Sequence, residues 1–244
     1  MLQIWTGETY RPTRDLDLLG KGMPNLSYQK IFSEVCSQDV EDDGLSFVSE
    51  TIRVERIRDE EAYEGVRVLL EVRLGNVRIP LQIDVGFGDA IVPGPEELEF
   101  PTLLNSPAPK LNAYSKESVV AEKFEAIVKL GMANSRMKDF YDLWVLAQRF
   151  QFESATLAAA IQGTFETRRT PLPSLLPLAF SADFHQSPNK QTQWKAFLRK
   201  SGLNADSSLE ETIRVIREFV MRVVEGILEG DRGKKIWQPE GPWR

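Results

Sequence analysis

The chain has 244 residues, of which 42% are hydrophobic and 27% are charged, and its formal net charge is −6 at pH 7. This length allows one large domain or two small ones, and the composition is that of a globular protein rather than a disordered or fibrous one. The negative charge argues against a protein that binds nucleic acid over its whole surface, although a local basic patch stays compatible with it.

The sequence contains one cysteine, Cys36, and one histidine, His185. A single cysteine rules out an intramolecular disulfide and fits a reducing compartment, so we expect a cytoplasmic protein. The same two counts disfavour a structural zinc site. No apolar run is long enough to span a bilayer and no signal-peptide pattern opens the chain, so we expect no membrane partner.

The first hundred residues have the patterns of a mixed α and β fold. A helix is predicted over residues 25–38, with Leu26, Ile31 and Val35 available for burial. Apolar alternation predicts strands, which we assign to residues 14–19, 49–57, 65–74 and 79–85. Gly75-Asn76 is a tight-turn signal, so the two strands that flank it must be antiparallel.

The pattern becomes helical after a proline-rich break at residues 106–109. Ser115 is a suitable N-cap and Gly131 a suitable C-cap for the first of these helices. The predicted helices cover residues 115–130, 136–150, 154–165, 192–200 and 209–228. The C-terminal segment 236–243 either packs on the helices or forms an interface. We therefore predict an α+β protein with an α+β domain at residues 1–105 and an all-helical domain at residues 110–244.

Three carboxylates are the first candidate site. Asp15 and Asp17 share one face of a predicted strand, because side chains alternate between faces. In the run 79–85, Asp84 lies opposite a face that we expect to be buried, formed by Ile79, Leu81, Ile83 and Val85. If the two strands are neighbours, three like charges converge, which is favourable mainly with a divalent cation among them. Carboxylates with Mg²⁺ are the minimal equipment for in-line transfer of a phosphoryl or nucleotidyl group.

Two helical stretches carry the second set of candidates. Lys123 has apolar residues at helical-neighbour spacing, so it either extends to solvent or is held for an anionic partner. Asp139 and Asp142 share a helix face, and Lys138 is spaced to pair with Asp142. Taken alone, this second pattern is also typical of a helix with a salt-bridged border.

Together these stretches resemble the AbiEii-type nucleotidyltransferase toxins, members of the DNA polymerase β-like superfamily. Asp15-Leu16-Asp17 looks like their Asp-x-Asp motif, and the segment 82–88 looks like the strand with their third carboxylate. Residues 114–126 are similar to their lysine motif, and residues 136–143 to their final acidic motif. The resemblance covers nearly the whole chain, with the motifs in order.

The resemblance implies a small mixed or antiparallel nucleotidyltransferase sheet with flanking helices, followed by the helical domain. It also implies a toxin of a bacterial toxin–antitoxin or abortive-infection system, which transfers a nucleoside monophosphate from a nucleoside triphosphate to an acceptor such as tRNA. The partners would then be a nucleoside triphosphate, tRNA or another RNA, and a cognate antitoxin protein.

The resemblance also implies roles for these residues. Asp15, Asp17 and Asp84 would be catalytic and would bind Mg²⁺ or Mn²⁺, and Asp84 could help to activate the acceptor hydroxyl. Lys123 would contact the triphosphate, with Lys138 as a second nucleotide-binding candidate. Asp139 or Asp142 would orient that lysine or the acceptor, and the sequence does not distinguish between them.

The chain departs from the superfamily pattern before Asp15. Relatives carry a Gly-Gly, Gly-Ser or Gly-Ala turn there, whose backbone N–H groups bind phosphates, and residues 1–14 do not contain it. We therefore expect that the true start lies upstream or that the gene is truncated, which leaves the nucleotidyltransferase core N-terminally incomplete. This keeps a catalytically degenerate binding protein as an alternative function. A metal-dependent phosphodiesterase is a third, which lacks the histidines that such hydrolases often add.

Overall fold

The computed structural model describes residues 2–7, 15–21, 27–40, 42–58, 64–102, 107–203, 208–231 and 233–244. The chain divides into two compact units, which we call the sheet unit (Thr13–Asp89) and the helical unit (Met1–Pro12 with Ala90–Arg244). We describe each unit by itself. The predicted domains at residues 1–105 and 110–244 stay a prediction. The two units are defined by contacts within the chain, whereas a domain is defined by its ability to fold independently.

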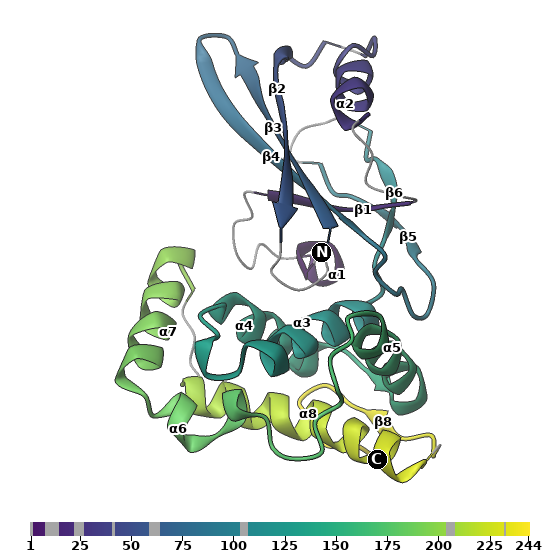
Figure 1. The fold of residues 1–244 in the computed structure, drawn as a ribbon, viewed down its shortest axis with the longest axis vertical. Helices are drawn as coiled ribbons and strands as arrows, with labels where there is room; N and C mark the ends of the chain where they lie inside the picture. Colours follow the sequence, from purple (N-terminus) through teal and green to yellow (C-terminus); the bar gives the residue numbers. More distant parts are fainter. Residues whose placement is uncertain are drawn as a thin grey trace. The chain divides into compact units, whose positions relative to one another are not determined.

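The sheet unit is built on a four-stranded sheet with the order β1-β4-β3-β2 (Figure 1). Its elements are β1 (Asp15–Gly20), α2 (Tyr28–Cys36), β2 (Leu45–Arg58), β3 (Glu64–Leu74) and β4 (Val77–Phe87). The strands β3 and β4 are antiparallel about the turn at Gly75-Asn76, as the sequence predicted. The strand β1 pairs with β4 in parallel, which meets the condition that the carboxylate-bearing strands are neighbours.

One face of this sheet forms the core of the unit. The buried residues alternate along the central strands, as Val66, Val68, Leu70 and Val72 in β3 and as Ile83, Val85 and Phe87 in β4. Ile79 was expected on the buried face but is 40% exposed. It lies toward the end of the β3–β4 hairpin, where Leu74 and Val77 are also exposed, so the apolar face extends past the core.

The helix α2 packs on this core through a different stripe from the one that we predicted. Tyr28, Phe32 and Cys36 are partly buried against the core, whereas Ile31 and Val35 are exposed. Residues four apart lie on the same helix face, so a helix seated on Tyr28, Phe32 and Cys36 turns Ile31 and Val35 away from the sheet. Leu26 lies outside the described residues.

The helical unit contains the helices expected from the sequence and several shorter elements that were not predicted. They are α1 (Leu2–Thr6), β5 (Glu96–Glu99), β6 (Lys110–Ala113), α3 (Lys116–Leu130), η1 (Gly131–Ala133), α4 (Met137–Arg149), β7 (Phe152–Glu153), α5 (Ser154–Thr167), η2 (Leu178–Phe180), α6 (Ala182–His185), α7 (Pro188–Ser201), α8 (Leu209–Glu229) and β8 (Ile236–Trp237). The helix α7 begins four residues before the predicted start, because proline suits the first turn of a helix. The described helices include none that is long and apolar enough to cross a membrane.

The core of the helical unit centres on α8. The helices α4 and α5 pack against α8, and α3 packs against both of them (Figure 1). Phe219 of α8 contacts the rings of Phe152, Trp237 and Trp243. Trp237 is 2% exposed, and its Nε1–H donates to the carbonyl oxygen of Ala147 at 2.7 Å. The C-terminal segment therefore packs on the helices, the first of the two alternatives given by the sequence.

The N-terminus of α3 is held by a buried hydroxyl network. Ser115 is fully buried; its Oγ accepts the N–H of Ser118 at 3.2 Å and lies 3.2 Å from the carbonyl oxygen of Val92. Ser118 Oγ in turn accepts the N–H of Val92 at 3.0 Å. This network fixes the start of the helix that carries Lys123.

Replacing the cap should therefore destabilise the helical unit. We expect Ser115→Ala to lower the free energy of unfolding by about 1–2 kcal/mol, because the N–H of Ser118 loses its acceptor and the carbonyl oxygen of Val92 keeps only one of its two hydroxyl donors. Urea denaturation followed by circular dichroism measures the change. Ser187→Ala is the matched control, since Ser187 caps α7 without a side-chain hydrogen bond and should cost little. Equal losses in the two variants would contradict the role given to Ser115.

Candidate functional site

The parallel pairing of β1 with β4 brings two of the predicted carboxylates to one position. Asp17 and Asp84 are direct partners in the register, and directly paired residues point their side chains to the same face of a sheet. Asp17 is exposed and Asp84 is partly buried. Asp15 pairs through its backbone with Gln82, and its side chain lies outside the described part of the structure.

Asp84 is bound by an arginine that the sequence analysis did not single out. Arg67 Nε donates to Asp84 Oδ1 at 2.8 Å, and Arg67 Nη2 donates to Oδ2 at 2.7 Å. The side-chain amide of Gln82 adds a contact of 3.2 Å to Oδ2. The hydrogen bond from Arg67 holds the pKa of Asp84 below its usual value, since it outweighs partial burial. Asp84 is therefore an ionised carboxylate with both oxygens directed at a cation.

Arg67 could have been found from the sequence. A two-residue turn fixes the register of a hairpin, so counting outward from Gly75-Asn76 places Arg67 opposite Asp84. The signal was an arginine between Val66 and Val68, at an alternating position of the strand that also carries Glu71 and Arg73.

The donor set on this face fits a hard divalent cation. Carboxylate oxygens are the ligands that Mg²⁺ prefers, and the guanidinium of Arg67 already stands as a cation at Asp84. Among the side chains that the structure describes, no three His, Cys, Asp or Glu residues lie together in a way that could hold a metal ion. The predicted triad needs Asp15, whose side chain is not among them. Its assignment to Asp15, Asp17 and Asp84 stays a prediction.

The second candidate cluster lies between α3 and α4 in the helical unit. Lys123 Nζ is 2.8 Å from Asp139 Oδ1 and 2.8 Å from Asp142 Oδ2. Asp139 and Asp142 lie one turn apart on α4 and are 0% and 1% exposed. The ammonium of Lys123 is thus held by two buried carboxylates. The sequence left open which aspartate accompanies the lysine, and in the structure both contact it.

Arg136 is a further member of this cluster that the sequence analysis did not assign. Its Nε lies 2.7 Å from Asp139 Oδ2, an ion pair in which the N–H is not directed along a hydrogen bond to that oxygen. Lys138 is exposed, so its assignment to nucleotide binding stays a prediction. With Arg136 counted, two cations face two carboxylates, and the cluster is close to neutral.

The environment of Lys123 favours its charged form. Burial alone would lower the pKa of the ammonium, but the charges of Asp142 and Asp139 outweigh burial, and the pKa lies above the ordinary lysine value. Lys123 therefore stays protonated at neutral pH, which suits a residue that neutralises an anion and does not suit a general base.

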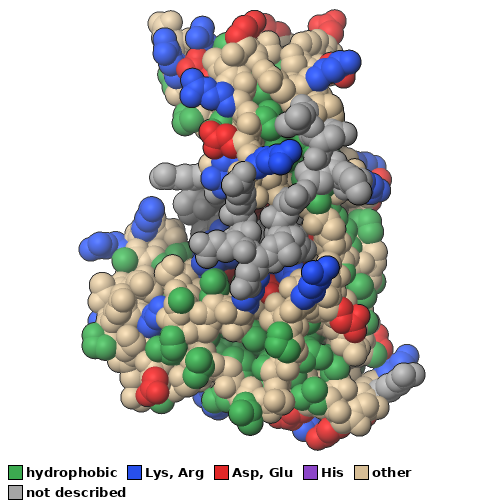
Figure 2. All heavy atoms as spheres, viewed as in Figure 1, with side chains coloured by type: hydrophobic (Ala, Val, Ile, Leu, Met, Phe, Trp, Pro, Cys, Tyr) green, Lys and Arg blue, Asp and Glu red, His purple; other side chains and the backbone are tan. Residues whose placement is uncertain are grey.

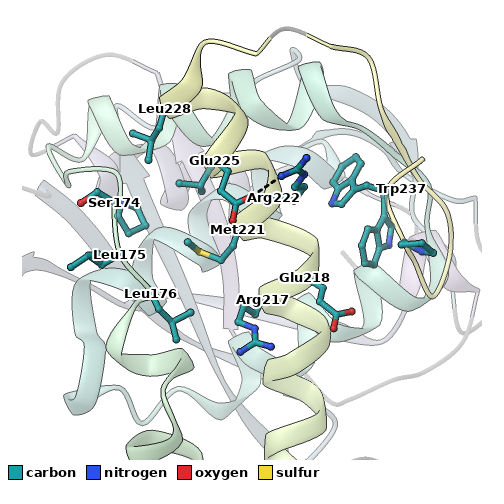
Figure 3. A pocket seen from close by; sticks show the side chains of 14 residues that line it. Ser174, Leu175, Leu176, Arg217, Glu218, Met221, Arg222, Glu225, Leu228 and Trp237 are labelled. Carbon is teal, nitrogen blue, oxygen red and sulfur yellow. Dashed lines mark hydrogen bonds and ion pairs between the residues drawn. The ribbon is translucent and has the colours of Figure 1, made fainter.

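One groove of the helical unit contains none of the predicted site residues. It has a volume of about 610 Å³ and lies along α8, between the segment 173–176 and the C-terminal tryptophans (Figure 3). Met221 and Leu228 contribute apolar surface, and Arg217 and Glu218 lie at one end of the view. On the face drawn in Figure 2, the described Lys and Arg side chains are interspersed with acidic and apolar ones.

Removing the lysine should destabilise the helical unit strongly. We expect Lys123→Met to lower the free energy of unfolding by about 3 kcal/mol, the lower end for a broken buried ion pair, because Arg136 stays beside Asp139. Urea denaturation measures the loss. Lys138→Met, on the exposed side of α4, should change stability by less than about 0.5 kcal/mol. A cost below about 1 kcal/mol for Lys123→Met would show that the two aspartates do not depend on the lysine.

The same cluster predicts a pH dependence. A pKa that is raised in the folded state means that the ion cluster stabilises fully below the ordinary lysine pKa of 10.5 and loses its effect as the pH rises through the folded-state value. The difference in stability between the wild type and Lys123→Met should stay constant from neutral pH to about 10 and shrink above it. Denaturation curves across this range measure the difference, and a decline that begins at lower pH would contradict the raised pKa.

Comparison with known proteins identifies the family. The crystal structure of a candidate nucleotidyltransferase from H. pylori is 15% identical, aligns over 96% of this chain and 88% of its own, and has a TM-score of 0.48. The crystal structure of JHP933 from Helicobacter pylori is also 15% identical, aligns over 90% and 79%, and has a TM-score of 0.45. No curated protein matches the sequence. The model of the nucleotidyl transferase AbiEii toxin family, of type IV toxin–antitoxin systems, matches residues 1–218, and the chain belongs to this family.

Proposed function

We propose that the chain is a Mg²⁺-dependent nucleotidyltransferase that transfers a nucleoside monophosphate from a nucleoside triphosphate to an RNA acceptor such as tRNA. Membership of a toxin–antitoxin family implies a nucleotide substrate and an antitoxin partner. The metal dependence, the acceptor and a cytoplasmic site of action are our proposals. The observation that supports the metal dependence is the direct pairing of Asp17 with Asp84 at one position of the β1–β4 register.

In this proposal the carboxylates of the sheet unit act as ligands. Asp15, Asp17 and Asp84 would hold Mg²⁺ or Mn²⁺. When bound, this ion neutralises the oxygens of the triphosphate and stabilises the negative charge that develops on the leaving pyrophosphate. The acceptor hydroxyl oxygen bonds to the α-phosphorus and its proton passes to water, while the bond from the α-phosphorus to the bridging β-phosphate oxygen breaks and pyrophosphate leaves. Asp84 is a weak acceptor for the hydroxyl proton while Arg67 lowers its pKa, so we assign it first to metal binding.

Lys123 has the properties of the residue that neutralises the triphosphate. It is charged, mostly buried and fixed by two carboxylates, so little side-chain freedom would be lost when it meets a phosphate. We assign Asp139 and Asp142 to orienting this lysine. Lys138 is the weaker candidate for nucleotide contact, because an exposed lysine on a helix surface is free to point to solvent.

A binding protein without catalytic activity is the second candidate function. The guanidinium of Arg67 neutralises the carboxylate of Asp84. This ion pair is compatible with a relative that binds nucleotide, RNA or an antitoxin without turnover. The phosphodiesterase alternative keeps no observation in its favour beyond the acidic residues themselves.

Transfer of radiolabel separates these functions. We expect the protein to transfer label from one of the four α-labelled ribonucleoside triphosphates to total tRNA in the presence of Mg²⁺. Asp15→Ala/Asp17→Ala should reduce the rate at least about 100-fold, because the metal ligands are lost. Asp42→Ala, an exposed residue that accepts the backbone N–H of Gly44, is the matched control and should retain the rate.

The outcomes differ for each function. Label on tRNA that disappears in the double variant and not in Asp42→Ala supports the transferase. Nucleotide binding by calorimetry without transfer, also from a form extended upstream of Met1, favours the binding protein. Shortened RNA without incorporated label would indicate a phosphodiesterase.

A further inference from the structure

A row of charged residues crosses the sheet unit at one register position. Glu55 of β2 pairs with Arg67 of β3, Arg67 pairs with Asp84 of β4, and Asp84 pairs with Asp17 of β1. Directly paired residues share a face, so all four side chains lie on the face opposite the apolar core. Across the strands, the charges read negative, positive, negative, negative. Arg67 is thus the one cation in a row that ends at two of the carboxylates proposed to bind metal.

The contact between Arg67 and Asp84 engages the whole carboxylate. Both oxygens accept from the guanidinium, at 2.8 and 2.7 Å, in the two-pronged geometry that makes arginine–carboxylate pairs strong and directional. The side chains are 37% and 22% exposed, so the pair lies near solvent. A divalent cation at Asp84 would meet this guanidinium at the same oxygens, where like charges repel.

We propose that Arg67 is a positioning residue that competes with the divalent cation for Asp84. Its guanidinium binds the carboxylate of Asp84 before the cation does and leaves it when the cation binds. Arg67 therefore weakens the metal affinity of the site. This inference rests on the proposed metal-dependent function. Gln82 is the second residue that holds Asp84. Its amide lies 3.2 Å from Asp84 Oδ2, so the carboxylate keeps a neutral donor when the guanidinium leaves.

The sign of the effect follows from charge. Replacing Arg67 by a neutral side chain removes a positive charge from beside two carboxylates, which strengthens their attraction for a divalent cation. The loss of orientation is smaller, because Gln82 still holds Asp84 and the strand backbone still pairs it with Asp17. Arg67→Gln should therefore bind metal more tightly, although it loses an ion pair.

Binding of Mn²⁺, measured by isothermal titration calorimetry on the full chain, tests this inference. We expect Arg67→Gln to bind Mn²⁺ about threefold to tenfold more tightly than the wild type. Arg67→Lys, which keeps the charge, should stay within about twofold of the wild type. Arg73→Gln is the matched control, because Arg73 lies on the same face of the same strand and pairs with Glu71 at 2.7 Å. Its Mn²⁺ affinity should not change. Circular dichroism of each variant verifies that it is folded.

The possible failures are distinguishable. Equal or weaker Mn²⁺ binding by Arg67→Gln, with wild-type binding intact, would overturn the role of Arg67 and leave the proposed function standing. Tighter binding by Arg73→Gln as well would assign the effect to overall charge and also overturn it. If no form bound Mn²⁺, the metal-dependent function itself would fail, and this inference with it.

Discussion

The register of the β3–β4 hairpin decides which side chains meet on the polar face of the sheet unit. The turn at Gly75-Asn76 pairs Leu74 with Val77, and from there each residue of β3 has one partner on β4. A slip of one residue would send the apolar residues of one strand to the polar face and separate Arg67 from Asp84. The buried alternation of Val66, Val68 and Leu70 makes that slip costly, since their transfer to water would cost several kcal/mol. The core of the unit therefore holds the polar row in place.

The cluster around Lys123 follows a different rule, because its charges are buried. Replacing a buried ion cluster with apolar residues is often neutral or favourable for stability, whereas removing one partner is strongly unfavourable. Asp139 and Asp142 are 0% and 1% exposed, so they contribute less to stability than apolar residues at the same positions would. Their presence between α3 and α4 is better explained by what they do to Lys123. They keep it charged and fix its ammonium at a defined point.

The sequence was sufficient wherever structure depends on local pattern. The four strands of the main sheet, the hairpin turn, the Ser115 cap and the main helices all follow from periodicity and capping chemistry. It was insufficient where burial depends on distant partners. Ile79 has the alternation of a buried residue, yet it lies where the apolar face extends past the core. The face that α2 presents to the sheet could not be chosen from spacing alone, because two apolar stripes compete on that helix.

The candidate site shows the same division. The identities of Asp17, Asp84, Lys123, Asp139 and Asp142 were available from the sequence, and their roles stay predictions. That Asp84 faces Arg67 was also within reach, because a two-residue turn fixes the pairing. The sequence analysis could only assume that β1 and β4 are neighbours. The two strands are separated by more than fifty residues, and no local sequence signal predicts their parallel pairing. The contact of Lys123 with both aspartates required the packing of α3 on α4.

Each cluster pairs cationic side chains with carboxylates, and this has a chemical consequence. Lys123, Arg136, Asp139 and Asp142 together carry almost no net charge, so this cluster alone attracts a polyanion weakly. At Asp84, likewise, Arg67 cancels the charge that would attract a metal ion. In each cluster an incoming ion must compete with a partner that is already well placed.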